Sequence, residues 1–234
     1  MKKILLSIIC AFPIFTFAQT NTATNPSPET QQWSNFIGVQ SNLLLRQVLN
    51  ISGSTATTNN PYLFTYSLIN NKTGWGLSAG LGLNTSSSSN KDTSGTSVKN
   101  SQTNFALRIG AEKRWYLSPK WATTLGFDAL YNNLSSHSET LQDENFEKII
   151  STTDDKTNSF GVGIRGAISF AITPRIWIGT ETNLSFLYGM EKVTSSTTFI
   201  QTGQPTITQS LTNKINSTSV TSNLPTAFFI IVKF

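Results

Sequence analysis

The stretch Trp121–Asn133 (WATTLGFDALYNN) decides the fold, because its residues alternate between two chemically different faces. One face carries Trp121, Thr123, Leu125, Phe127, Ala129 and Tyr131, and the other carries Ala122, Thr124, Gly126, Asp128, Leu130 and Asn132. A period of two residues sustained over this length predicts a β-strand with one apolar face. Phe160–Ile172 repeats the pattern, with aliphatic and aromatic residues on one face and small or polar residues on the other.

Six further segments are predicted strands; five of them alternate, 36–46 and 223–234 more roughly, and 61–69 is too apolar for alternation to decide its facing. They are residues 36–46, 61–69, 74–85, 104–117, 176–188 and 223–234. Short connections at Asn70–Thr73, Ser118–Lys120 and Thr173–Arg175 interleave with longer ones, rich in Ser, Thr and Asn, at 50–60, 86–103, 137–158 and 195–218. Short turns on one side and long loops on the other are typical of outer-membrane barrels. The sequence therefore predicts an all-β fold, an eight-stranded antiparallel up-and-down transmembrane β-barrel.

The first 34 residues differ in composition from the strands. Met1-Lys2-Lys3 is positive, residues 4–17 are apolar, and Thr16-Phe17-Ala18 places small residues where signal peptidase requires them. We expect residues 1–18 to be a cleaved signal peptide and residues 19–34, which are polar and contain two prolines, to be a linker. Residues 35–234 form the predicted barrel.

Composition narrows the possible functions. The 38% hydrophobic, 12% charged and 11% aromatic content excludes a disordered chain. The net charge of +5 gives no basis for nucleic-acid binding. The single cysteine, Cys10, lies in the predicted signal peptide, so the exported chain has neither a disulfide nor a thiolate metal site. We expect no cofactor, no metal and no catalytic residues.

Six charged residues share the glycine-rich face of the predicted strands: Arg108, Glu112, Arg114, Asp128, Arg165 and Glu181. A charged face crowded with glycine suits a narrow barrel interior, and the large apolar face then meets lipid. Lys113 is the one exception, and near a strand end it can extend to the interface.

The interior charges are expected to pair with one another, because an unpaired buried charge is costly. Counting from the turns places Arg165 and Glu181 on neighbouring strands, within about one residue step of facing each other. Eight strands enclose a lumen that side chains fill, which favours a structural plug over a proton relay or a selectivity ring.

Aromatic residues gather near both ends of the predicted strands. Trp75, Trp115, Trp121, Phe170 and Phe234 fall at the ends next to the short turns, and Tyr62, Phe105, Tyr131, Phe160 and Tyr188 fall at the ends next to the long loops. Two such rings are expected at the two membrane interfaces, although aromatic residues also favour strands in general.

The chain ends in AFFIIVKF, with Phe228, Ile230, Val232 and Phe234 on one face. This ending resembles the C-terminal signal by which the outer-membrane assembly machinery recognises its clients. The whole mature chain resembles the small outer-membrane β-barrel proteins of Gram-negative bacteria, of the eight-stranded OmpA/OmpX type without a periplasmic domain. The resemblance implies a location in the cell outer membrane, with outer-membrane lipids and the assembly machinery as partners. It implies no activity.

Two motifs are weak. Gly161–Gly166 matches G-x-G-x-x-G, but the match lies inside an alternating strand and not in the strand-to-helix turn that a dinucleotide requires. His137-Ser138-Glu139 holds the sole histidine, yet neighbours in one loop do not form a catalytic triad. The sequence favours a non-enzymatic structural or surface-interaction protein whose surface ligand is unknown. A small-solute pore, a lipid-modifying enzyme and a secreted β-sandwich remain as alternatives.

Overall fold

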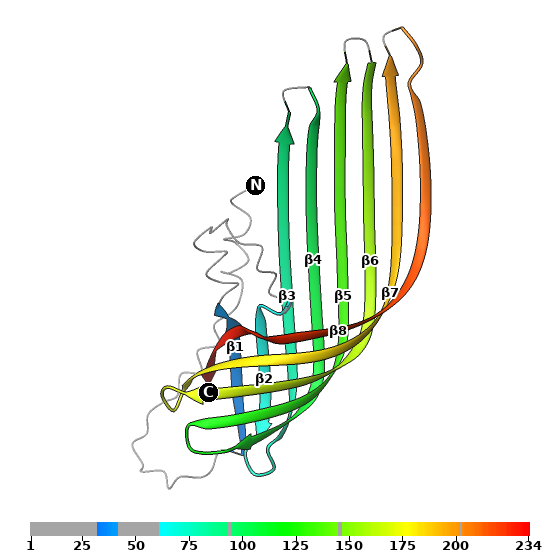
Figure 1. The fold of residues 1–234 in the computed structure, drawn as a ribbon. Coiled ribbons are helices and arrows are strands. Elements are labelled where there is room, and N and C mark those ends of the chain that lie inside the picture. Colours follow the sequence, from blue (N-terminus) through cyan, green and yellow to red (C-terminus); the bar gives the residue numbers. More distant parts are fainter. Residues whose placement is uncertain (1–31, 42–60, 93–94, 145–146, 202) are drawn as a thin grey trace, which may run out of the picture. The chain divides into compact units, whose positions relative to one another are not determined.

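The computed structural model describes residues 32–41, 61–92, 95–144, 147–201 and 203–234, and they form one closed antiparallel barrel in which each strand pairs with the next and β1 pairs with β8 (Figure 1). The strands are β1 (Trp33–Gln40), β2 (Phe64–Asn70), β3 (Trp75–Lys91), β4 (Ser97–Tyr116), β5 (Trp121–Glu144), β6 (Glu147–Ala171), β7 (Ile176–Gln201) and β8 (Ile207–Lys233). The predicted fold class is confirmed, and a single closed sheet excludes the β-sandwich. In the described part of the chain, no helix is both long and apolar enough to cross a membrane.

Several of the segments predicted from the sequence cannot be compared with the structure. The predicted signal peptide, most of the predicted linker and the predicted loop at 50–60 lie outside the described residues. β1 begins at Trp33, so the last two residues of the predicted linker belong to the barrel wall.

The three short turns share one construction. Asn70 Oδ1, Ser118 Oγ and Thr173 Oγ1 each accept hydrogen bonds from the backbone N–H groups two and three residues further on. A polar side chain that closes on its own backbone in this way stabilises a tight reversal. The first turn ends at Gly74, whose φ of +71° favours glycine. All three short connections lie where the sequence predicts them.

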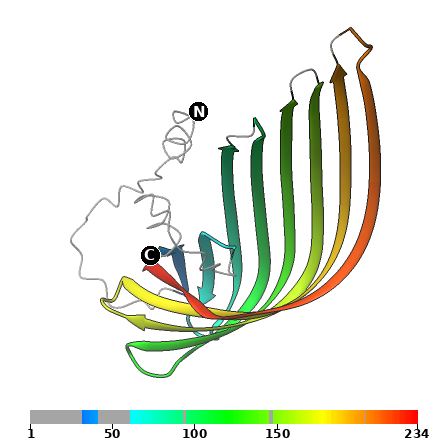
Figure 2. The same ribbon diagram turned by 45° about the horizontal axis from the view of Figure 1, so that its top comes forward.

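Three of the predicted long loops are wrong. Most residues of 86–103, 137–158 and 195–218 continue the strands, since β3 runs to Lys91, β4 begins at Ser97, β5 runs to Glu144, β6 begins at Glu147, β7 runs to Gln201 and β8 begins at Ile207. The upper parts of β3–β8 extend well beyond the ends of β1 and β2 as one curved sheet (Figure 2), which we call the projecting sheet. Its residues are mostly polar on both faces, with scattered apolar residues such as Leu211 and Ile215, so they lack the alternation that predicts a strand, although threonine favours strands.

The ring closes with a large stagger. The row of cross-strand partners that begins at Val39 in β1 passes through Phe64, Tyr131 and Phe160 and reaches Thr218 in β8. The partner of Val39 on β8 is nevertheless Ile230, twelve residues further along. Part of this offset arises at a bulge, where Glu181 and Asn183 of β7 face Ala227 and Asn223. A stagger of this kind means that the strands tilt against the barrel axis.

Candidate functional site

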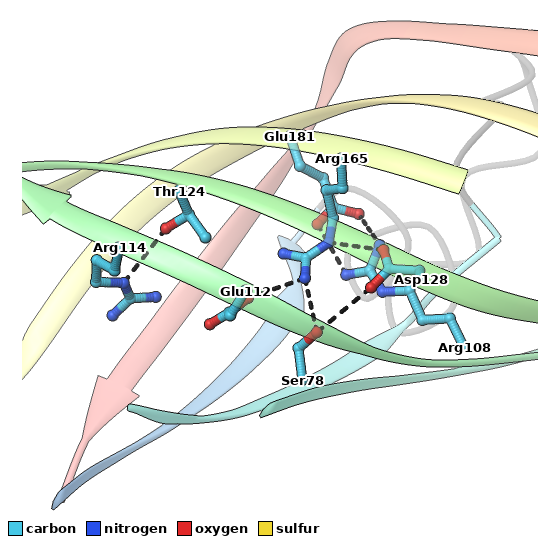
Figure 3. A network of polar contacts seen from close by, with 8 residues as sticks. All are labelled: Ser78, Arg108, Glu112, Arg114, Thr124, Asp128, Arg165 and Glu181. Atoms are coloured by element: carbon cyan, nitrogen blue, oxygen red, sulfur yellow. Dashed lines mark hydrogen bonds and ion pairs between the residues drawn. The ribbon is translucent and has the colours of Figure 1, made fainter. Parts of the chain in front are cut away.

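The six predicted interior charges are all buried inside the barrel, with 0–8% of each residue exposed. They come from four successive strands. Arg108, Glu112 and Arg114 lie on β4, Asp128 on β5, Arg165 on β6 and Glu181 on β7. Figure 3 shows five of these side chains gathered in the lumen, with Arg114 apart from them beside Thr124. Three positive and three negative side chains balance in formal charge.

Arg165 is the centre of the larger network. Its Nε donates to Asp128 Oδ2 at 3.0 Å, and its Nη2 donates to Glu112 Oε2 at 2.9 Å and to Ser78 Oγ at 2.7 Å. Ser78 Oγ lies 3.4 Å from Asp128 Oδ1 and donates to it. One guanidinium therefore joins side chains from β3, β4 and β5 to β6, through charge-assisted hydrogen bonds in a site that water hardly reaches.

Gly126 makes this arrangement possible. Glu112, Gly126 and Arg165 are consecutive partners in one cross-strand row, with the glycine between the two charges. A Cβ atom on Gly126 would lie 2.8 Å from Arg165 Nη2. Because the glycine has no side chain, the guanidinium crosses over β5 and reaches the carboxylate on β4. This explains why glycine and charge share a face in the sequence.

Arg108 and Glu181 form a second, bidentate ion pair. Arg108 Nη1 and Nη2 donate to the two carboxylate oxygens of Glu181 at 2.7 and 2.8 Å. The predicted partnership of Arg165 with Glu181 is therefore corrected: Arg108 is the bidentate partner of Glu181, and Arg165 binds Glu112 and Asp128. The strand tilt explains the difference, since it brings residues together that do not share a row.

Tyr62 also lies in the interior, against the prediction that it belongs to an aromatic ring at the membrane interface. Only 3% of it is exposed, and its ring centre lies 4.5 Å from the Arg108 guanidinium carbon. Tyr62 precedes β2, where the local sequence is too apolar for alternation to decide the facing. Tyr62 thus holds Arg108 through a cation–π contact, in addition to its ion pair with Glu181.

Arg114 is held differently from the other two arginines. Its Nε donates to Thr124 Oγ1 at 3.3 Å, and its guanidinium carbon lies 4.0 Å from the ring centre of Phe36 on β1. Among the described residues it forms no ion pair with a carboxylate. A cavity of about 50 Å³ lies beside it, lined in part by Phe36, Thr124 and Ser169. This volume holds a water molecule or two but no larger solute.

The outer surface of the ring is apolar and exposed. Residues with 45–62% exposure include Leu77, Ile109, Leu125, Phe127, Val162, Ile164, Ile168, Leu184 and Phe186. Lys113 bends back at one rim, where its Nζ donates to Thr73 O and lies 5.4 Å from the Trp75 ring centre. A continuous apolar band around a closed barrel far exceeds the patches of soluble monomers.

Aromatic side chains bound this band at two heights. Trp121 and Phe170 pack with ring centres 4.9 Å apart, and Tyr131 and Phe160 pack at 5.0 Å. The ten residue positions between Trp121 and Tyr131 span about 33 Å along β5 at roughly 3.3 Å per residue. For strands tilted by about 40°, the axial distance is about 25 Å, the height of the apolar band of a membrane barrel.

The sequence motifs fall into place on the strands. Gly161–Gly166 lies within β6 and not in the strand-to-helix turn that a dinucleotide-binding motif requires. At the C-terminus, Phe228, Ile230 and Phe234 are 48–60% exposed on the outer face, and Val232 is half-buried. The described residues contain no group of three or more His, Cys, Asp or Glu side chains that could hold a metal ion.

His137 has partners that the sequence did not indicate. Its Nδ1 lies 2.7 Å from Asp154 Oδ1 on β6, and Ser101 on β4 is its cross-strand partner on the other side. Ser138 points to the opposite face, where it donates to Asn100 at 2.7 Å. Only the register of three strands, which the sequence does not display, places Ser101, His137 and Asp154 in one row.

No protein-family model matches the sequence, and no curated protein sequence matches it. Three solved structures are similar to the chain. A major outer membrane protein from Thermus thermophilus is 11% identical, with 86% of this chain and 98% of that chain covered and a TM-score of 0.41. CarO from Acinetobacter baumannii is 12% identical, with coverages of 87% and 96% and a TM-score of 0.36. LpxR from Salmonella typhimurium is 9% identical, with coverages of 86% and 99% and a TM-score of 0.23.

TM-scores below 0.5 do not by themselves show a common fold, so the architecture rests on the strand pairing of this chain. That pairing is an eight-stranded antiparallel ring with neighbours in sequence order, closed between β1 and β8. It is the architecture of the small outer-membrane barrels that the sequence resembles.

Proposed function

We propose that the chain is an integral outer-membrane β-barrel protein with a non-enzymatic role, in which a closed ring anchors the projecting sheet at the cell surface. The observation that carries the proposal is the ion-pair network across the lumen. Arg165 ties β6 to Glu112 and Asp128, and Arg108 ties β4 to Glu181 on β7. A filled, cross-linked interior stabilises a wall and leaves no path for a solute.

The membrane location follows from the two surfaces of the ring. Large apolar side chains face outward and charges face inward, which is the reverse of a soluble barrel. The band between the Trp121 and Tyr131 rings matches the thickness of a bilayer interior in height. Export through a cleaved signal peptide at residues 1–18 and assembly through the C-terminal strand belong to the same proposal.

The projecting sheet supports a role in surface interaction. Six strands continue past the aromatic residues Tyr131 and Phe160; their residues are exposed in β3 and β8 and mostly half-buried in β5, β6 and β7. Its surface is dominated by Ser, Thr and Asn, as at positions 84–90 and 207–218. Rigid strands that present polar side chains on both faces offer a large, fixed surface for contact outside the membrane.

Two measurements on the refolded protein test this proposal. Samples loaded on a gel with and without boiling are expected to differ in mobility, since a closed barrel resists detergent until heated. In planar bilayers the protein is expected to show no discrete conductance steps, because the ion-pair network fills the lumen. Stable steps that enlarge in a Glu112→Gln/Asp128→Asn variant would instead support the alternative of a small-solute pore.

The row Ser101, His137 and Asp154 favours a second candidate, a lipid-modifying enzyme. The residue types suit nucleophilic catalysis, and the His137–Asp154 distance of 2.7 Å suits a base held by an acid. Among the described contacts, however, no hydrogen bond joins Ser101 to His137. The row also lies within paired strands, where backbone N–H groups are engaged in the ladder and unable to stabilise an oxyanion.

Lipid analysis of outer membranes separates the two candidates. Cells producing the wild type, Ser101→Ala and His137→Ala variants are expected to have the same lipid profile if the protein is non-enzymatic. A deacylated lipid that appears with the wild type and disappears in both variants would establish the enzyme. Ser138→Ala is the matched control, because Ser138 lies on the opposite face of the same strand.

A further inference from the structure

Three lysines lie side by side on neighbouring strands of the projecting sheet. Lys156 on β6 is the cross-strand partner of Lys192 on β7, and Lys192 is in turn the partner of Lys214 on β8. All three residues are exposed. Because directly opposite residues of an antiparallel pair have their Cβ atoms only about 5 Å apart, the three lysine side chains leave the sheet side by side, within about 10 Å of one another.

The lysine row shares a face with the membrane-facing surface of the ring. Lys156 lies four residues before Phe160 on β6, and Lys192 lies four residues after Tyr188 on β7. Phe160 and Tyr188 are cross-strand partners and point outward, with 49% and 42% exposure. Side chains separated by an even number of residues in a strand point to the same face. The row therefore lies on the outer face, directly above the upper aromatic residues.

Acidic partners are missing from this row. In the described part of the chain, none of the three lysines forms an ion pair with a carboxylate. Asp154, the nearest acid on the same face of β6, is engaged with His137. Asp155 and Glu191 adjoin Lys156 and Lys192 in sequence and so point to the opposite face. Like charges opposite one another destabilise a sheet, and a bound anion would remove that repulsion.

The height of the row indicates which anion is within reach. Four residues along a tilted strand place the lysines about 10 Å above the aromatic ring, at roughly 3.3 Å per residue and a tilt of about 40°. Aromatic rings mark the level of the membrane–water interface, and the polar headgroup zone extends several Å beyond it. A lysine side chain bending back toward the membrane spans the remaining distance.

We infer that Lys156, Lys192 and Lys214 form a binding site for the phosphate groups of outer-leaflet glycolipids. Each ammonium donates hydrogen bonds to phosphate oxygens, and three such groups on adjacent strands neutralise a dianionic phosphate. The inference rests on the proposed outer-membrane location. It adds a specific lipid contact that orders one lipid against β6–β8 at the base of the projecting sheet.

Native mass spectrometry of the folded full-length chain in detergent micelles tests the inference. The probe is diphosphoryl lipid A, compared with the same lipid after removal of both phosphates. Lys156→Gln/Lys192→Gln/Lys214→Gln is expected to bind diphosphoryl lipid A at least about tenfold more weakly than the wild type. Lys72→Gln/Lys91→Gln/Lys120→Gln removes the same charge from exposed positions elsewhere and is expected to bind as the wild type.

Three results would overturn the inference: unchanged binding by the lysine-row variant, equal binding of the dephosphorylated lipid, or displacement of the lipid by excess inorganic phosphate. The last result would indicate a site for free phosphate. Lys192→Gln alone is expected to weaken binding, and Lys192→Arg to retain it, so the test remains decisive if the triple variant folds poorly. Loss of lipid binding with an intact mobility shift on gels concerns this site, whereas loss of the shift in the wild type concerns the proposed function.

Discussion

Arg108 on β4 and Glu181 on β7 form two parallel hydrogen bonds of 2.7 and 2.8 Å across the lumen, although the cross-strand row of Glu181 leads to Arg114 instead. Arg108 lies six residues from Arg114 along β4. Because the ring closes with a stagger, Arg108 and Glu181 meet in the lumen although they belong to different cross-strand rows. Bidentate geometry leaves both carboxylate oxygens satisfied and holds two distant parts of the wall at a fixed separation.

Substituting one residue of this ion pair is expected to destabilise the barrel more than substituting both. Glu181→Leu leaves the buried guanidinium of Arg108 without its counterion, and we expect a loss of about 3–5 kcal/mol in unfolding free energy. Arg108→Leu/Glu181→Leu removes both charges and is expected to recover most of that loss. Urea titration in lipid vesicles, followed by tryptophan fluorescence, measures both variants. A double variant less stable than Glu181→Leu would contradict this account.

The three buried arginines are expected to differ in importance. Arg165→Met leaves the buried carboxylates of Glu112 and Asp128 without their counterion, and it should lower the unfolding free energy by about 3–5 kcal/mol. Arg114→Met removes only the Thr124 hydrogen bond and the Phe36 contact, so a loss of about 1–2 kcal/mol is expected. The temperature at which the unboiled gel band disappears ranks the two variants. Equal temperatures would show that Arg114 has a charge partner of comparable strength.

Gly110 on the inner face of the wall and Gly166 on the outer face are expected to respond differently to substitution by alanine. A Cβ on Gly110 would lie 2.2 Å from both the Phe127 carbonyl oxygen and Asp128 Oδ1, whereas a Cβ on Gly166 would have only Thr182 Cγ2, at 3.5 Å, within 4 Å. Gly110→Ala is expected to destabilise the barrel by about 1–3 kcal/mol through overpacking. Gly166→Ala should be neutral or slightly stabilising. The same urea titration compares them, and similar midpoints would contradict the facing of β4 or β6.

The sequence predicts the strands of the barrel wall well, because apolar and polar or small residues alternate along each of them. Neighbouring residues of opposite polarity, such as Phe127 and Asp128 or Ile164 and Arg165, show which side chain faces outward and which faces inward. This can be read from a short segment alone. The short turns are equally local, because Ser118 and Thr173 bond their own backbone. Strand number and order follow from these two signals.

The contacts across the lumen depend on information that no single segment contains. Which carboxylate meets Arg108 is set by the tilt of all eight strands, and the row of Lys156, Lys192 and Lys214 exists only once β6, β7 and β8 are in register. The length of the strands was underestimated for a related reason. A sheet with solvent on both faces does not need alternating polarity, so residues such as 195–201 gave no signal.

The apolar band is expected to be intolerant of charge, in contrast to the projecting sheet. Phe127 is 58% exposed and lies midway between Trp121 and Tyr131. Phe127→Lys places an ammonium near the bilayer midplane, and a loss of about 2–4 kcal/mol is expected in vesicles. Ser210→Lys, at an exposed position on β8, should have no effect. If both variants unfold at the same urea concentration, the band does not face lipid.

Neighbouring strands of the barrel are joined by very different numbers of cross-strand residue pairs. Among the residues that the structure describes, five pairs join β1 to β8, seven join β1 to β2 and six join β2 to β3, whereas twenty-four join β5 to β6. Strands that follow each other in sequence, such as β5 and β6, can pair early, whereas β1 also has to pair with a strand nearly two hundred residues away. We therefore expect completion of the ring to be a slow, late step of assembly, and we expect the barrel to open sideways toward the lipid most easily between β1 and β8.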